Sequence, residues 1–167
     1  MAVVAIFLAA ILMFVFPLMT TADKKDDISA LTIQTATTEF TDTIRTTGVI
    51  TQENYDNFIL TIGATGNSYD VEMTVHVLDE NPAKKSARQE TTIGDNVYYT
   101  MYTTQILDTL KTSPTLALKE GDIVSVSVKN TNTTIAGQLR NFMYKVTGNN
   151  LNSIAASSSG IVTTNGK

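Results

Sequence analysis

The N-terminal stretch MAVVAIFLAAILMFVFPLMTTA, residues 1–22, contains no charged side chain. An apolar run of about 20 residues forms roughly 30 Å of α-helix, which matches the thickness of the hydrocarbon core of a bilayer. At Asp23 the sequence becomes polar and rich in threonine. The run therefore predicts a helix that rests in a membrane or packs against other apolar helices.

The composition leaves room for one globular domain beyond this run. The chain has 167 residues, so about 120 remain for a head once the helix is set aside. Its net charge is −4 and its 12 basic residues are scattered, which argues against a nucleic-acid surface. It has no cysteine, which excludes disulfides, thiolate metal sites and a cysteine nucleophile.

Three interpretations of residues 1–22 compete. A cleaved signal peptide would carry a basic n-region and a shorter apolar core. A plain anchor would carry Lys or Arg on its cytoplasmic flank. The third interpretation, which we favour, is that Met1 is a mature N-terminus left after removal of a basic leader, and that the segment packs against copies of itself. Pro17 predicts a kink or local unwinding between Met13 and Met19, either as a hinge or as a tolerated membrane proline.

Apolar residues return after the polar patch of residues 23–27 with helical spacing. From Ile33 onward these apolar residues are three, four and four positions apart, which predicts an amphipathic helix that ends at Gly48. We therefore expect one helix up to about Thr47, with residues 1–22 apolar all round, residues 23–47 amphipathic and residues 48–167 forming the head. The residues expected to pack this helix on the head are Ile33, Ala36, Phe40 and Ile44.

The head combines helical and strand patterns. Thr51 can cap a short helix that contains Tyr55, Phe58, Ile59 and Ile62. Alternation predicts strands over residues 69–77, 123–128 and 141–147, with a weaker one over residues 87–93. Apolar residues four apart predict a helix over residues 97–111, and the tail from Ser153 is expected to be a mobile loop or an edge strand. The fold class is thus α+β, a long N-terminal helix packed on a small antiparallel β-sheet head.

Few residues suggest chemistry. The lone His76 on a polar strand face is typical of a surface histidine. Asp70 with Glu72, or Asp79-Glu80-Asn81, could bind calcium, although a solvated face is the favoured interpretation. No catalytic constellation or cofactor motif is present, so we expect no enzyme and no cofactor. Asn132-Thr133-Thr134 matches a glycosylation acceptor pattern in an expected loop.

An apolar helix whose second half is amphipathic and leads into a β-rich head resembles the type IV pilin superfamily. The stretch TTGVITQENYDNFILTIGATGNSYDVEM, residues 46–73, is similar to Tad-type pilin-like proteins of Gram-positive bacteria. Most such pilins carry a glutamate about five residues into the mature chain, where this chain has Ala5. Apolar packing, and not charge, would then set the register between subunits.

This resemblance implies a structural subunit of an extracellular pilus that serves adhesion, cell contact or DNA uptake. It implies a homo-oligomeric helical filament at the cell surface, with the subunit held in the cytoplasmic membrane before assembly. The implied partners are a prepilin peptidase, an assembly ATPase and a platform membrane protein. The expected assembly core is Met1, Val4, Ile6, Phe7, Leu8, Ile11, Leu12, Phe14, Val15, Phe16, Pro17 and Leu18. The alternative is a membrane-anchored extracellular binding domain that stays monomeric.

Overall fold

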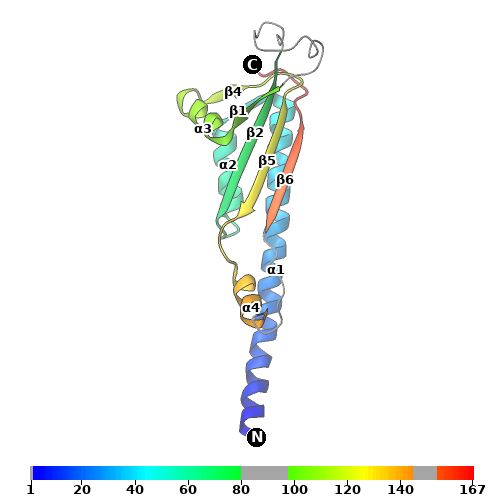
Figure 1. The fold of residues 1–167 in the computed structure, drawn as a ribbon, viewed down its shortest axis with the longest axis vertical. Helices are drawn as coiled ribbons and strands as arrows, with labels where there is room; N and C mark the ends of the chain where they lie inside the picture. Colours follow the sequence, from blue (N-terminus) through cyan, green and yellow to red (C-terminus); the bar gives the residue numbers. More distant parts are fainter. Residues whose placement is uncertain (1, 80–97, 145–153) are drawn as a thin grey trace, which may run out of the picture.

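Helix α1 (Ala2–Thr47) organises the whole molecule. The computed structural model describes residues 2–79, 98–144 and 154–167. Figure 1 shows an elongated molecule in which α1 runs from the N-terminal end to the far end, where the C-terminus also lies. The rest of the described chain packs along the second half of this helix, and the first half projects from it.

The remaining elements follow in the order expected for an α+β head. They are β1 (Val49–Thr51), α2 (Gln52–Gly63), β2 (Tyr69–Leu78), β3 (Tyr98–Tyr102), α3 (Thr103–Thr112), β4 (Thr115–Ala117), β5 (Ile123–Asn130), α4 (Ile135–Tyr144) and β6 (Ala155–Ile161). β1 pairs with β4, and the other strands form a four-stranded antiparallel sheet in the order β3-β2-β5-β6. The predicted fold class is confirmed.

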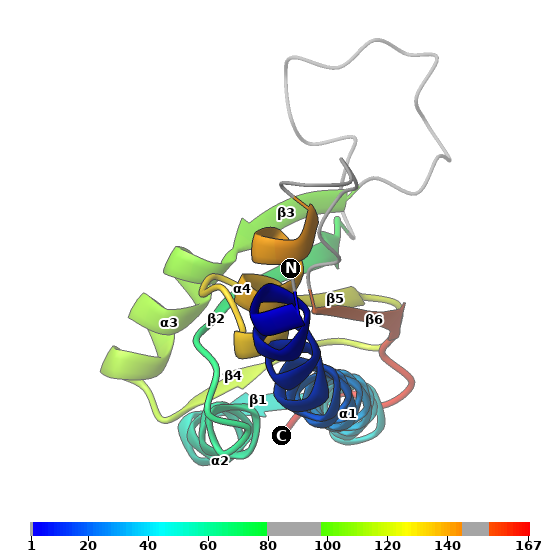
Figure 2. The same ribbon diagram turned by 90° about the horizontal axis from the view of Figure 1, so that it is seen from below.

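The sheet turns one apolar face toward the helices. In the β2–β5 pair, Met73 lies opposite Val126 and Val75 opposite Val124, and all four are buried. Alternate residues such as Asp70 point to solvent, as the two-residue period of a strand requires. Figure 2 shows α1 and α2 side by side on the same side of this sheet.

Small polar residues let α1 pack tightly on the sheet. Ser29, Thr37 and Thr41 are buried on the face that carries Ile33 and Ile44. Their hydroxyls donate to the carbonyl oxygens four residues earlier, at 2.9, 2.6 and 2.8 Å respectively. These side chains therefore bring no unpaired polar group into the core, where such a group would cost about 1–3 kcal/mol.

Two predicted elements are wrong. Residues 98–102 form a strand and not the first turn of a helix, because the aromatic run YYTMY suits a strand and pairs with β2, Met101 opposite Val75. The helix starts only at Thr103. Residues 141–144 belong to α4 and not to a strand, because Thr134 caps this helix by accepting from the Gly137 N–H at 3.0 Å.

Other sequence predictions have mixed outcomes. The strands predicted over residues 69–77 and 123–128 are confirmed, as is Thr51 as the cap of α2, where its hydroxyl accepts from the Asn54 N–H. The tail forms the edge strand β6. The strand predicted over residues 87–93 lies outside the described residues, as do residues 145–147. The pairing of β1 with β4 was not predicted.

Pro17 does not interrupt α1. The helix is continuous from Ala2 to Thr47, so the local unwinding predicted between Met13 and Met19 is not found. The hydroxyls of Thr20 and Thr21 donate to the carbonyl oxygens of Phe16 and Pro17, at 3.0 and 2.9 Å. These bonds do not replace the one that Pro17 removes, because the carbonyl oxygen that loses its helical partner is that of Met13, an exposed residue.

Gly48 ends α1 and receives the C-terminal tail. Its φ of +70° reverses the chain after the last helical turn, as the sequence predicted. The Gly48 carbonyl oxygen accepts from the Leu118 N–H at 2.7 Å, and the Leu118 carbonyl oxygen accepts from the Gly166 N–H at 2.8 Å. These two hydrogen bonds connect the end of α1 to the residue after β4, and that residue to the C-terminal tail.

Asp122 is a buried carboxylate with a structural role that sequence analysis missed. It is 1% exposed. One carboxylate oxygen accepts from the Leu78 N–H at 2.9 Å and the other from the Lys119 N–H at 2.8 Å. Its backbone carbonyl oxygen accepts from the Val162 N–H. Asp122 thus joins the end of β2, the loop before β5 and the segment after β6.

We expect Asp122→Asn to lower the free energy of unfolding by about 1–3 kcal/mol. Asparagine keeps one acceptor oxygen, but its amide group then faces a backbone N–H and leaves that donor unpaired. Chemical denaturation of the full-length protein in detergent micelles measures the change. Asp108→Asn is the matched control, because the Asp108 carboxylate forms an exposed ion pair with Lys111 and its loss should change stability by less than about 1 kcal/mol. Equal losses in the two variants would contradict the role assigned to Asp122.

Candidate functional site

The first half of α1 presents an uncovered apolar surface. Among the described residues, α1 is the one helix long and apolar enough to cross a membrane, and none of its most apolar window is buried. Phe14 is 77% exposed and Phe7 66% exposed, although large apolar side chains usually find cover. Figure 1 shows this part of α1 extending beyond every other labelled element. By length and composition this part of α1 could span a membrane.

The structure places the predicted assembly residues on all sides of this half. Pro17 is exposed and Val15 is half-buried, while Met1 and the side chain of Leu8 lie outside the described residues. The exposed members are Val4, Ile6, Phe7, Ile11, Leu12, Phe14, Phe16 and Leu18. A surface apolar all round can be contacted from several directions at once, which a single amphipathic stripe does not allow.

A polar boundary closes this apolar surface at residues 23–27. There α4 lies alongside α1, and Arg140 forms an ion pair with Asp23. One turn further on, the Thr134 hydroxyl donates to the Asp26 carboxylate at 2.7 Å. Both contacts join residues more than 100 positions apart. These two contacts hold α4 and the residue before it against α1, next to the end of the apolar run.

The second half of α1 is embedded in the head. Ile33 and Ile44 are fully buried, and Ala36 and Phe40 are 8% and 6% exposed. These four residues, predicted to pack the helix on the head, lie together in its hydrophobic core. The two halves of one continuous helix therefore have opposite environments.

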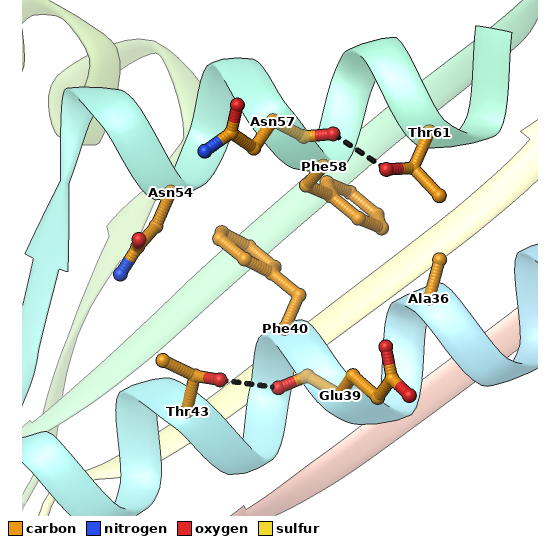
Figure 3. A pocket seen from close by; sticks show the side chains of 8 residues that line it. All are labelled: Ala36, Glu39, Phe40, Thr43, Asn54, Asn57, Phe58 and Thr61. Atoms are coloured by element: carbon orange, nitrogen blue, oxygen red, sulfur yellow. Dashed lines mark hydrogen bonds between the residues drawn. The ribbon is translucent and has the colours of Figure 1, made fainter. Parts of the chain in front are cut away.

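Phe40 is the main contact between α1 and α2. Its ring stacks on that of Phe58 with centroids 4.6 Å apart and planes 4° apart, and it tilts against Tyr55 at 6.4 Å. Both rings line a groove of about 200 Å³ between the helices, together with Glu39. Figure 3 shows the two rings facing each other between α1 and α2. Burial, with a smaller contribution from Asp56, raises the pKa of the Tyr55 hydroxyl above its ordinary value. The folded state thus favours the neutral phenol.

The candidate ligand residues that the structure describes lie on β2, which pairs with β3 and β5 in the sheet, or directly after it. The half-buried His76 has its Nδ1 2.9 Å from the Thr100 hydroxyl on the neighbouring strand. Asp70 and Glu72 are exposed on one strand. Among the residues that the structure describes, no three His, Cys, Asp or Glu side chains gather as a metal site would need. Glu80 and Asn81 of the third candidate lie outside the described residues.

Asn132, the predicted glycosylation acceptor, lies exposed in the loop before α4. Its side-chain oxygen accepts from the Ser68 N–H at 2.8 Å, and its side-chain nitrogen donates to the Asn67 oxygen at 3.2 Å. The side chain thus holds two loops together. A glycan on this nitrogen would replace one of the hydrogens through which the amide donates.

The pairing of Arg140 with Asp23 is the functional feature that sequence reasoning missed. A single arginine just before the strand predicted over residues 141–147 gives no local signal of this ion pair. A helical reading of residues 135–144, with Ala136 and Arg140 four apart, would have placed both on the same face. No protein-family model, curated protein sequence or solved structure matches the chain.

Proposed function

We propose that this protein is a structural subunit that polymerises through the apolar half of α1 into an extracellular helical filament of the type IV pilin kind. The observation that carries the proposal is the uncovered apolar surface of residues 2–22 on a helix whose second half is locked into the head. A contact surface that is rigidly joined to its domain suits a subunit that bears load along a filament.

The energetics favour two successive environments for this surface. Each large apolar side chain that leaves water contributes roughly 1.5–3 kcal/mol. In a membrane most of that gain is already made, so assembly from lipid relies on close packing between helices and not on the hydrophobic effect. The subunit would therefore rest in the cytoplasmic membrane and then move into a filament core, with the head facing solvent.

The wider assembly system follows from the sequence resemblance. A prepilin peptidase, an assembly ATPase and a platform membrane protein would process the subunit and drive it into a filament. The filament would act in adhesion, cell contact or DNA uptake. Catalysis has no part in this proposal, because the head supplies support and an outer surface.

We expect deletion of residues 2–22 to abolish both membrane insertion and filament formation while the head keeps its structure. Electron microscopy of cells that express the full-length protein with its assembly system should show fibres containing the protein, and the deleted chain should give none. Circular dichroism of the deleted chain checks that the head remains folded. Fibres built from the deleted chain would overturn the proposal.

A matched replacement separates the filament from a monomeric anchored domain. Residues 2–22 are exchanged for an unrelated membrane-spanning helix of equal length. This chain should insert in the membrane but fail to form fibres, because only the anchoring property is kept. If the unmodified protein stays monomeric at the cell surface in the presence of its assembly system, the anchored binding domain is the better description.

A further inference from the structure

A cleft opens at the polar boundary, between the end of the apolar half of α1 and the start of α4. Its volume is about 260 Å³, and loop residues Gly66 and Asn67 close its upper side. Sites for drug-sized ligands begin at roughly 300 Å³, so this cleft fits a compact polar group better than a whole lipid or cofactor. The cleft shares only Leu18 with the predicted assembly residues and no lining residue with the groove at Phe40.

The position of the cleft along α1 determines where it would lie relative to a bilayer. Its lower wall includes Leu18 and Ala22, the last apolar turns of the run. If residues 2–22 cross the hydrocarbon core, they span about 31 Å at 1.5 Å per residue, and the cleft then lies in the headgroup layer. This step rests on the membrane placement within the proposed function.

The walls of the cleft are apolar below and charged above. Ile135, the first residue of α4, is 59% exposed and lines the cleft together with Leu18 and Ala22. Lys25 stands on the upper wall. Its ammonium group makes no ion pair within the part of the chain that the structure describes, and it lies beside Gly66.

The groups around Lys25 are fixed in place. The Asp26 carboxylate, the nearest acid in sequence that lines the cleft, already accepts the Thr134 hydroxyl at 2.7 Å. The Asn67 and Asn132 side chains bond to each other at 3.2 Å. Within the described residues Lys25 is thus a cation without an ion-pair partner, and the proposed membrane placement puts it at the depth of the lipid phosphates.

We propose that this cleft binds the headgroup of an anionic phospholipid. The phosphate sits against the Lys25 ammonium, and the glycerol backbone with the first acyl carbons lies against Leu18, Ala22 and Ile135. Lys25 and Asp26 both line the cleft, so it has no net positive charge, and recognition of the headgroup rests on direct contact between the Lys25 ammonium and the phosphate. The bound lipid would hold the head at a set height above the bilayer.

The first test measures the depth of the cleft in a membrane. The chain contains no tryptophan, so each single substitution gives one fluorophore. Full-length Ile135→Trp, Phe14→Trp and Leu60→Trp are placed in phosphatidylcholine–phosphatidylglycerol vesicles with a nitroxide quencher at the headgroup or deep in the acyl chain. Ile135→Trp should respond most to the headgroup quencher and Phe14→Trp to the deep one. Leu60→Trp, an exposed position on α2, should respond to neither.

The quenching results distinguish failure of the lipid-binding cleft from failure of the membrane placement of residues 2–22. Quenching of Phe14→Trp without quenching of Ile135→Trp would overturn the cleft proposal and leave the membrane placement intact. Absence of quenching at both positions would overturn both. If a second copy of the chain covers Ile135, Phe14→Trp should be quenched and Ile135→Trp should not.

The second test asks whether Lys25 recognises the lipid. The full-length protein is taken from nanodiscs containing phosphatidylglycerol, and the lipid retained per chain is counted by native mass spectrometry. Lys25→Gln should retain about fivefold less phosphatidylglycerol, the effect expected for one lysine at an anionic surface. Lys24→Gln is the matched control, because Lys24 has the same charge and depth but does not line the cleft, and it should change retention by less than about twofold.

Two results would overturn this assignment. Equal losses in Lys24→Gln and Lys25→Gln would mean that only general surface charge attracts the lipid. Displacement of phosphatidylglycerol by millimolar inorganic phosphate would mean that the cleft binds free anions and not the membrane lipid.

Discussion

Gly48→Ala should lower the free energy of unfolding by about 3–5 kcal/mol. A Cβ at this position would lie closer than 3.0 Å to three backbone atoms of Thr164, Asn165 and Gly166. The φ of +70° costs a non-glycine residue about 1–2 kcal/mol. Displacing the tail also breaks the backbone hydrogen bond from Gly166 to Leu118, and each such bond contributes about 1 kcal/mol.

Thermal unfolding of the full-length protein in detergent micelles measures this effect, and the midpoint should fall by roughly 10 °C or more. Gly63→Ala is the matched control, because a Cβ at Gly63, the last residue of α2, meets nothing within 4 Å. That variant should be neutral or slightly more stable, since alanine favours a helix over glycine by about 0.5–1 kcal/mol. Similar behaviour of the two variants would show that the tail does not depend on the close approach at Gly48.

Phe40→Ala should cost about 3–5 kcal/mol, the range measured for removing a buried aromatic ring. The ring is 6% exposed and stacks on Phe58 (Figure 3). Its loss leaves a hole between α1 and α2 in the hydrophobic core. Chemical denaturation in detergent measures the change, and hydrogen exchange should show weaker protection of α2.

Leu31→Ala is the control for Phe40→Ala. Leu31 lies on the same helix but is 68% exposed, so its truncation should change stability by no more than about 0.5 kcal/mol. Phe40→Leu should fall between the two, because it keeps most of the apolar volume. A loss below about 1 kcal/mol for Phe40→Ala would mean that the α1–α2 contact is not part of the stable core.

The parts of the fold that sequence predicted have strong internal periodicity. The steps of three and four from Ile33 to Ile44 indicated the helix and its buried face without knowledge of the partner. The alternation around Met73 and around Val126 did the same for β2 and β5. These signals are local, because each repeats within one element and reflects a single large apolar surface.

The missed parts depend on contacts between distant residues. Tyr98 and Tyr102 have helical spacing, but the free edge of β2 makes the strand the better choice for them. Arg140 gains its role only because folding brings it to Asp23, and Asp122 because two loops converge on its carboxylate. The spacing of residues along the sequence does not indicate which distant residues folding brings together. The apolar half of α1 could be predicted from composition alone, whereas the contacts of Arg140 and Thr134 with residues 23–27 could not.

The pairing of α1 with β6 sets an order of events during synthesis. β6 is the element that α1 contacts most extensively in the head, yet it follows the end of α1 by more than 100 residues. At about 5–20 residues per second, the ribosome needs roughly 5–20 seconds to make the intervening chain. Throughout that interval the amphipathic half of α1 has no sheet edge to cover it. The head therefore closes last, and a chain crossing a membrane would stay loose enough to be threaded until its final strand has passed.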